Sequence, residues 1–362
     1  MSGHGRDNDV RGIRLIEWEN VRARTRARVR TYVTIVAVSV IVGVAYAIFV
    51  SYGFQPLPTA AIVGGISGGL IGSTVGGLDI FYFRSRRGRR VAQAPFLVSV
   101  LVKGLLYGLV IAIVIVGQVS SRLVGVYDPA SFLGANDVRA VAFSVVITVA
   151  FIFMLEISQL VGGRNLRNLV MGRYHTPRVE DRFFLFVDVR GSTGIAERLG
   201  APGVHAFLDR VFTLAADPVE ETRGEIHQYV GDEMVVTWPV SVGLVDARPL
   251  ACFFEIEATL DAAAAEFRRD FGVAPRVRAS LHAGEVVAGE VGATKREIVF
   301  HGDVMNTASR LEQVAGELDH RLVASADAVK RLVGTDRYSL KEIGRCRVRG
   351  REQAIEVYSV AP

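Results

Sequence analysis

The sequence predicts a chain of two parts, an α-helical transmembrane bundle followed by an α+β domain. Half of the 362 residues are hydrophobic, which is a high fraction for a soluble protein. Long apolar segments fill the first half, whereas from about residue 181 short apolar runs alternate with helical stretches. The length is also sufficient for about two domains.

Four apolar segments have the length that a helix needs to cross a hydrocarbon core of about 30 Å. They lie near residues 31–50, 59–83, 95–117 and 138–162. The preceding segment is too long and too rich in arginine for an ordinary signal peptide, so we expect the first span to remain as an anchor. The prediction is a membrane domain with four transmembrane helices over residues 31–162.

Arginine clusters next to the apolar segments predict the topology. They comprise Arg22, Arg24, Arg26, Arg28 and Arg30 before the first segment, and Arg84, Arg86, Arg87, Arg89 and Arg90 after the second. The positive-inside rule then places the N-terminus, the 84–94 loop and the second half of the chain in the cytosol. We expect a multi-pass protein of the cell (inner) membrane. The net charge of +5 is explained by contacts with lipid headgroups, and no nucleic-acid partner is expected.

The second apolar segment contains Gly64, Gly68, Gly72 and Gly76, a spacing that places small residues on one helix face. Such a face allows close approach of another helix. Packing within one bundle is the favoured interpretation, and a seam between two copies of the chain is the alternative.

Three ionisable residues, Asp79, Lys103 and Glu156, lie inside the second, third and fourth apolar segments. The topology brings them to the same half of the membrane, so we expect them to meet. Charges inside a membrane are costly and are usually paired or functional. A structural ion cluster is the favoured interpretation, with a sensing or coupling site as the alternative.

The second half of the chain reads as β-α-β-β-α-β with a long final hairpin. Strands are predicted at 183–189, 225–231, 233–239, 276–288 and 297–301, and helices from Ser192 to about Arg223, at 246–270 and from Asp303 to about Val314. This order predicts a ferredoxin-like α+β fold, in which helices cover a central antiparallel sheet. The expected organisation is a basic cytosolic segment (1–30), the membrane domain (31–162), a connector (163–180) and a catalytic domain (181–362).

Asp188 ends a predicted buried strand, and Asp232 lies at the tip of the predicted hairpin. Adjacent sheet elements can bring both carboxylates together. Two carboxylates with a main-chain carbonyl suit Mg²⁺ or Mn²⁺, which keep water ligands and bind substrate phosphates. The turn Gly191-Ser192-Thr193 then exposes N–H groups at a helix N-terminus, which favours phosphate binding. Either aspartate alone is better explained as a cap or turn residue.

Asn306 and Arg310 lie four residues apart on the helix that follows Gly302, so they share one face. An amide that holds a sugar oxygen and a guanidinium that stabilises phosphoryl charge are what phosphoryl transfer requires. An exposed polar face is the alternative for this pair alone.

Four segments resemble the class III nucleotidyl cyclase catalytic domain in order and spacing: FLFVDVRGST, YVGDE, HAGEVVAGEVG and FHGDVMNTASRLE. The resemblance covers about residues 181–362. It implies that Asp188 and Asp232 bind two divalent cations, Mg²⁺ or Mn²⁺, with help from the Val189 carbonyl. The expected reaction is cyclisation of a nucleoside triphosphate with release of pyrophosphate.

The same resemblance implies that Asn306 and Arg310 stabilise the transition state. It further implies that a basic residue of the C-terminal hairpin holds the triphosphate, with Arg349 the first choice and Arg351 the second. Finally, it implies a head-to-tail homodimer in which the metal-binding aspartates of one subunit face the asparagine and arginine of the other.

At the positions where this family reads the base, the chain departs from the common residues. Adenylate cyclases commonly have lysine where this chain has Gln228, and aspartate or threonine where it has Val299. Guanylate cyclases commonly use glutamate and cysteine there. Glutamine both donates and accepts hydrogen bonds, so neither purine is excluded. ATP is the predicted substrate on family frequency, with GTP as the alternative and a catalytically degenerate nucleotide-binding module as the non-enzyme alternative.

Overall fold

The computed structural model describes residues 29, 31–49, 57–83, 94–123, 135–346 and 354–362. Contacts divide the chain into two compact units, Met1–Val161 and Gly162–Pro362. Gly162 has a positive φ of 86° at this division. Glycine adopts such a conformation at low cost, which suits the end of a long helix.

The first unit is helical. It contains the helix Thr31–Phe49, α2 (Leu57–Gly77) with its π-helical continuation η1 (Leu78–Phe83), α4 (Phe96–Leu123) and α5 (Ala135–Val161). Three stretches are long and apolar enough to cross a membrane, namely Thr31–Phe49, Ala61–Phe83 and Phe96–Val114. In α5 the apolar stretch among the described residues, Ala142–Ser158, is shorter. The fourth predicted span therefore stays a prediction.

The glycine face of α2 packs against the helix Thr31–Phe49 of the same chain. A Cβ atom at Gly64 would lie 2.5 Å from the Cβ of Ala47, and one at Gly68 would collide with the carbonyl oxygen of Ser39. Helix backbones approach this closely only where the facing residues are small. Packing within one chain, the favoured interpretation, is what the structure shows.

The three ionisable residues of the first unit meet, as predicted. Lys103 Nζ lies 2.6 Å from Glu156 Oε1 and 3.7 Å from Asp79 Oδ1. Ser99 Oγ donates to Glu156 at 3.0 Å, and the Tyr107 hydroxyl donates to Asp79 at 3.4 Å. All five side chains are buried. The charges are thus paired and hydrogen-bonded inside the helical unit, which is what a buried charge requires.

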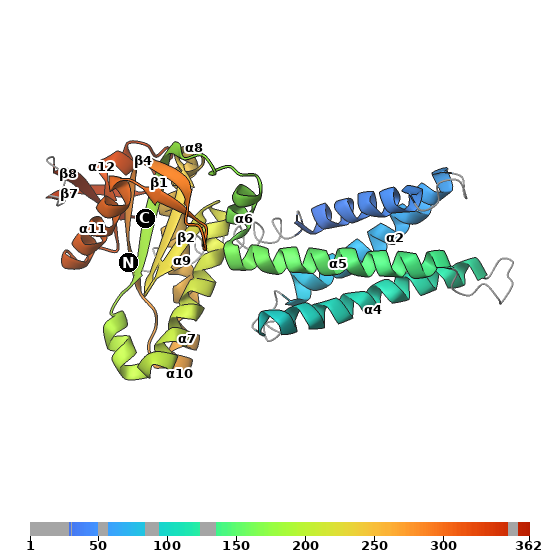
Figure 1. The fold of residues 1–362 in the computed structure, drawn as a ribbon. Helices are drawn as coiled ribbons and strands as arrows, with labels where there is room; N and C mark the ends of the chain where they lie inside the picture. The colour runs from blue at the N-terminus through green and yellow to red at the C-terminus, as the bar shows by residue number, and fades with distance from the viewer. Residues whose placement is uncertain (1–28, 30, 50–56, 84–93, 124–134, 347–353) are drawn as a thin grey trace, which may run out of the picture. The chain divides into compact units, whose positions relative to one another are not determined.

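The second unit is built on an eight-stranded mixed sheet (Figure 1). The strand order is β2-β3-β1-β4-β6-β8-β7, and β5 pairs with β4 outside this path. The strands are β1 (Arg178–Val189), β2 (Glu225–Val230), β3 (Glu233–Pro239), β4 (Val277–Val291), β5 (Glu297–His301), β6 (Leu322–Ser325), β7 (Ser339–Cys346) and β8 (Ile355–Ala361). Neighbouring strands are antiparallel except β4 and β6, which are parallel. The sequence predicted a central antiparallel sheet and did not predict this parallel pair, because the apolar pattern of a short strand after the last helix does not reveal the direction of that strand.

Helices of this unit follow the predicted order with interruptions. They are α6 (Gly163–Val170), α7 (Ser192–Glu221), α8 (Val240–Gly243), η3 (Val245–Ala247), α9 (Arg248–Ala262), α10 (Ala264–Phe271), α11 (Asp303–Glu317) and α12 (Ala326–Val329). Gly200 interrupts α7 with a φ of 68°, followed by Pro202. The helix predicted over 246–270 is divided into α9 and α10 at Ala263.

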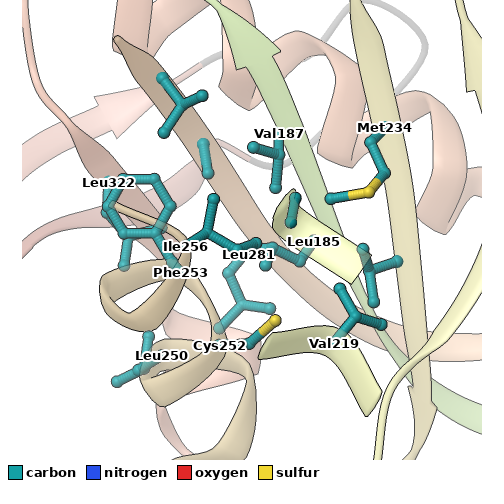
Figure 2. Packing of buried hydrophobic residues seen from close by; sticks show 14 of the residues in the cluster. Leu185, Val187, Val219, Met234, Leu250, Cys252, Phe253, Ile256, Leu281 and Leu322 are labelled. Carbon is teal, nitrogen blue, oxygen red and sulfur yellow. The ribbon is translucent and has the colours of Figure 1, made fainter. Parts of the chain in front are cut away.

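Strand β1 is buried on both faces from Phe183 to Val189, which explains why this part of its sequence is an apolar run. Leu185 and Val187 join a core with residues of α7 and α9 on one face of the sheet (Figure 2), to which Phe267 of α10 also belongs. Phe184 and Phe186 pack on the other face with residues of β5 and α11. The predicted buried central strand is confirmed, and its last residues, at Asp188 and Val189, are fixed by packing from both sides.

Candidate functional site

The first site element is the junction between the end of β1 and the β2–β3 turn. Asp188 lies opposite Glu233 in the antiparallel register, and Val189 N–H donates to the Asp232 carbonyl at 3.3 Å. Gly231 has a φ of 63°, which a tight turn at this place requires. Asp188 and Asp232 therefore lie together at one end of the sheet.

Two residues that the sequence did not single out complete this carboxylate cluster. Arg278 Nη2 on β4 lies 2.8 Å from Asp188 Oδ2, and its Nε donates to Glu312 Oε1 on α11, also at 2.8 Å. Asp188 and Arg278 are direct neighbours in the β1–β4 register. The sequence does contain an indication of this contact. Arg278 stands between two buried strand residues, Val277 and Ala279, and burying an arginine without a charged or polar partner costs free energy.

The cluster contains more negative than positive charge. Burial, followed by Glu312 and Asp232, raises the pKa of Asp188 to about 7, although Arg278 acts in the opposite direction. Burial, followed by Glu312 and Asp188, also raises the pKa of Glu233 to about 7. The Arg278 guanidinium pairs with two of these carboxylates, Asp188 and Glu312, so bringing a further cation to this place would lower the free energy of the charged forms of the cluster.

The donor set fits a hard divalent cation that is shared with a substrate. Among the residues that the structure describes, no group of three or more His, Cys, Asp or Glu side chains is arranged as a complete metal site. Asp188 and Asp232 would supply two carboxylates, and the Val189 carbonyl lies in the same strand end. Mg²⁺ is commonly held by one or two carboxylates, waters and substrate phosphates, so an incomplete protein ligand set is what such a site needs.

The turn after β1 presents main-chain N–H groups. Gly191 precedes α7 with a φ of 70°, and no side chain caps the helix that begins at Ser192. Thr193 is exposed in the first turn. The first N–H groups of a helix have no partner within the helix and attract anions. Gly191, Ser192 and Thr193 thus lie at the start of α7, and their role in phosphate binding stays a prediction.

Asn306 and Arg310 lie one turn apart on α11, which begins after Gly302. The opposite side of this helix is buried through Thr307 and Ala308. Asn306 is exposed, and in the described part of a single chain no hydrogen bond or ion pair joins it to the carboxylate cluster. Glu312, on the same helix, does belong to that cluster through Arg278.

The predicted base-reading positions lie on two different strands. Gln228 is exposed on β2, directly after a bulge between Ile226 and Gln228. Val299 is half-buried on β5. The predicted triphosphate-binding Arg349, and its alternative Arg351, lie outside the described residues.

The fold and this arrangement of the carboxylate cluster, the N–H turn and α11 define a nucleotide cyclase catalytic domain. Residues 175–361 match the family model described as the adenylate and guanylate cyclase catalytic domain. The match covers half of the chain, and the chain belongs to this family. The resemblance to class III nucleotidyl cyclases found in the sequence is thereby confirmed.

Two relatives of the chain are named adenylate cyclases. "Adenylate cyclase 2" of Rhizobium meliloti (strain 1021) is 39% identical over 209 residues, 58% of this chain and 58% of that protein. "Adenylate cyclase" of Anabaena cylindrica is 25% identical over 211 residues, 56% of this chain and 40% of that protein. The chain thus spans less than two thirds of either relative.

A solved structure of a bacterial light-regulated adenylyl cyclase has the same fold. It superimposes with a TM-score of 0.51 and 18% sequence identity, covering 60% of this chain and 64% of that chain.

Proposed function

We propose that the chain is a membrane-anchored adenylate cyclase that converts ATP to 3′,5′-cyclic AMP and pyrophosphate. The observation that supports it most is the carboxylate cluster at the end of β1, in which Asp188 lies opposite Glu233 and beside Asp232, and in which burial, followed by the neighbouring carboxylates, raises the pKa values of Asp188 and Glu233 to about 7. Structural carboxylates are normally balanced by their neighbours, whereas those of functional sites are often not. ATP is favoured over GTP because the two relatives described above are named adenylate cyclases.

In the proposed reaction the ribose 3′-oxygen attacks the α-phosphorus in line. The new bond joins O3′ to the α-phosphorus, the bond from the α-phosphorus to the bridging oxygen breaks, and pyrophosphate leaves. Bound divalent cations would lower the pKa of the 3′-hydroxyl and neutralise the triphosphate. Asp188, Asp232 and the Val189 carbonyl would hold them, and the 3′-hydroxyl proton would pass to solvent.

The other site residues act on the nucleotide. The N–H groups of Gly191, Ser192 and Thr193 would hold phosphate oxygens at the start of α7. Asn306 would orient the ribose. Arg310 would neutralise the charge that grows on the α-phosphoryl group in the transition state, so its loss lowers turnover more than binding.

Substrate contacts from the remaining residues complete the proposal. Gln228 and Val299 would face the purine, and Arg349 would hold the triphosphate. The site would form between two copies of the chain, with Asp188 and Asp232 of one copy facing Asn306 and Arg310 of the other.

We further propose that four helices span the cell membrane with the N-terminus and the catalytic unit on the cytosolic side. Three stretches long and apolar enough to span support it, together with the arginine clusters at residues 22–30 and 84–90. The catalytic core would have the ferredoxin-like βαββαβ arrangement, which agrees with the neighbouring order β2-β3-β1-β4.

Product analysis of the purified full-length chain tests this function. The protein is supplied with ATP or GTP in Mg²⁺ or Mn²⁺, and the products are separated by chromatography. Asp188→Asn keeps the shape of the side chain but removes a ligand charge, so we expect cyclic AMP formation to fall at least about 100-fold. Asp181→Asn is the matched control, because Asp181 lies on the same strand and pairs with Arg331 at 3.0 Å, outside the carboxylate cluster.

Each outcome decides a different point. Cyclic AMP that is lost with Asp188→Asn but kept with Asp181→Asn supports the proposal. Cyclic GMP as the main product keeps the chemistry and overturns the substrate. Nucleotide binding without any cyclic product under either metal makes the chain a signalling module without catalysis.

A further inference from the structure

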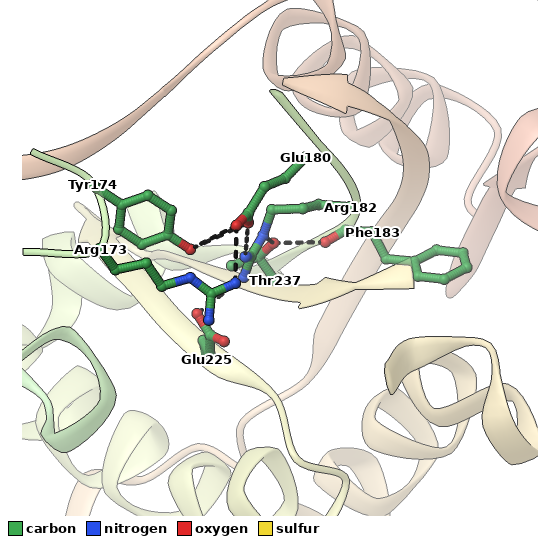
Figure 3. Close-up of polar contacts among 7 residues, drawn as sticks. All are labelled: Arg173, Tyr174, Glu180, Arg182, Phe183, Glu225 and Thr237. Atoms are coloured by element: carbon green, nitrogen blue, oxygen red, sulfur yellow. Dashed lines mark hydrogen bonds and ion pairs between the residues drawn. The ribbon is translucent and has the colours of Figure 1, made fainter. Parts of the chain in front are cut away.

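Arg182 on β1 is a buried cation with an unusually complete set of partners (Figure 3). Its side chain is 1% exposed. Nη1 lies 2.8 Å from Glu180 Oε2, Nη2 lies 2.9 Å from Glu225 Oε2, and Nε donates to Thr237 Oγ1 at 3.0 Å. The guanidinium therefore joins three strands, β1, β2 and β3, at one point.

The partners of Arg182 are themselves held in place. Glu180 also accepts hydrogen bonds from the Tyr174 hydroxyl at 3.1 Å and from Arg173 Nη2 at 3.1 Å. Thr237 Oγ1 donates in turn to the Phe183 carbonyl at 2.8 Å. A buried network in which the polar groups have hydrogen-bond partners is rigid, because moving any one side chain would break several hydrogen bonds.

Stability alone does not account for this arrangement. Replacing a buried ion pair by apolar side chains of similar volume is often neutral or stabilising, so a charged network contributes chiefly to geometry. The geometry that Arg182 defines is the position of β2 and β5 relative to β1.

The link to β5 is an aromatic contact. The guanidinium carbon of Arg182 lies 4.7 Å from the ring centroid of Phe300, a cation–π distance. The ring of His227 on β2 packs edge-on against the same ring, with centroids 4.9 Å apart. Arg182, Phe300 and His227 thus connect the two strands that carry the predicted base-reading positions.

Each contact lies next to one of those positions. Phe300 follows Val299 directly on β5. His227 precedes Gln228, and the register of β2 shifts between Ile226 and Gln228. A bulge re-aims the side chains that follow it, so its position on the sheet sets where Gln228 points.

We propose that Arg182 is a positioning residue for the purine base. Through Glu225 it holds the bulged strand β2, and through Phe300 it holds β5, so that Gln228 and Val299 are kept at a fixed separation. Gln228 and Val299 then contact the base of the nucleotide, and Arg182 keeps these two side chains in position without contacting the base itself. This inference rests on the proposed function, because it concerns the base of the cyclase substrate.

Steady-state kinetics of the full-length chain in detergent test the inference. The variants are Arg182→Met, Arg182→Lys and Glu225→Gln, each measured with ATP and with GTP and each checked by thermal unfolding. The control is Arg210→Met. Arg210 also pairs with two carboxylates, Glu266 and Asp270, and also lies over a ring, that of Phe267 at 4.9 Å, but between α7 and α10.

We expect Arg182→Met to raise the KM for ATP roughly tenfold while kcat changes by less than about threefold, because misplacing substrate contacts weakens binding of the base. The ratio of kcat/KM for ATP to that for GTP should fall by a similar factor. Arg182→Lys should recover part of both, since an ammonium pairs with a carboxylate but lacks the planar fork. Arg210→Met should leave the KM and the ratio unchanged.

The inference is overturned if folded Arg182→Met has the KM and the ATP to GTP ratio of Arg210→Met. If Arg182→Met melts below the assay temperature, Glu225→Gln is used instead, with the KM for ATP and the ATP to GTP ratio as the deciding measurements. This variant removes only the charge of the carboxylate, because glutamine keeps the shape of the side chain and an acceptor for Arg182. A wild-type chain that forms no cyclic product instead overturns the proposed function itself. An active wild type with unchanged variants overturns only the role of Arg182.

Discussion

At the scale of single residues, Asp188 combines burial with a shortage of positive charge. Its pKa is raised to about 7, chiefly by burial, and that of Glu233 is raised similarly. An acid whose pKa is higher in the folded state binds its proton more tightly when folded. Its contribution to stability is therefore present below the unfolded pKa, near 4, and is lost as the pH rises to about 7.

The raised pKa of Asp188 predicts how metal binding depends on pH. We expect Mg²⁺ to raise the melting temperature of the full-length chain more at pH 8 than at pH 5.5, because protons compete with the cation below pH 7. Thermal unfolding with Mg²⁺ and with a chelator, at both pH values, measures the difference. In Asp188→Asn the Mg²⁺-dependent shift should be lost at both. An equal Mg²⁺ shift at the two pH values would contradict the role of this carboxyl group.

The sequence predicted some of these residues better than others. Asp188 and Asp232 could be placed together because each ends a recognisable local element, an apolar run and a hairpin. Arg278 and Glu312 could not be placed there, because their contacts depend on the pairing of β1 with β4 and on the packing of α11, both of which join distant parts of the chain. Arg182 was missed for the same reason. Its four partners lie on four strands, namely Glu180 on β1, Glu225 on β2, Thr237 on β3 and Phe300 on β5.

At the scale of elements, α2 shows how a residue pattern becomes a helix contact. The stripe of glycines predicted close packing, and the structure shows that the partner is the helix Thr31–Phe49. Spacing alone identifies the smooth face of a helix but not what covers it. The π-helical segment η1 that follows was not predicted, since a single extra residue per turn leaves no clear trace in hydrophobic periodicity.

Substitution within the stripe should separate these two helices. In Gly68→Leu the added side chain would collide with the backbone at Ser39. We expect a loss of about 1–3 kcal/mol, seen as a lower melting temperature of the protein in detergent. Gly104→Leu on α4 is the control, because a Cβ atom there meets no atom within 4 Å. Equal melting temperatures for the two variants would show that this contact does not stabilise the unit.

At the scale of the whole molecule, the chain consists of two compact units, Met1–Val161 and Gly162–Pro362. The sequence predicted the change of character near residue 181, and the division of contacts falls after Val161. The α6 segment therefore belongs with the catalytic unit, together with Tyr174, which is buried in its core. Hydrophobic patterning marks where spans end, but it does not show to which body a short polar helix attaches.

The proposed head-to-tail dimer predicts complementation between inactive variants. Asp188→Asn and Arg310→Ala should each be inactive alone, because each spoils both sites of a homodimer. Co-expressed with different tags and purified through both, the mixed dimer should contain one intact site and one doubly altered site, giving about half the activity of a wild-type dimer. Cyclic AMP formation by the doubly purified protein measures this. Inactivity of a stable mixed dimer would place all site residues in one subunit.

Lys103 gives three helices one shared ammonium group, and this has a consequence for biogenesis. Taken singly, α4 would bring a cation into the bilayer, while η1 and α5 would each bring a carboxylate, and each unpaired charge would cost up to about 2.5–3.5 kcal/mol, the value at the centre of a span. Only the assembled helices offset these costs. In the membrane-anchored protein proposed above, the order of synthesis then matters. The segment with Asp79 leaves the ribosome first, and its carboxylate stays unpaired until the segment with Lys103 has been synthesised. Glu156 follows last. Stable insertion of each of these helices therefore depends on the others.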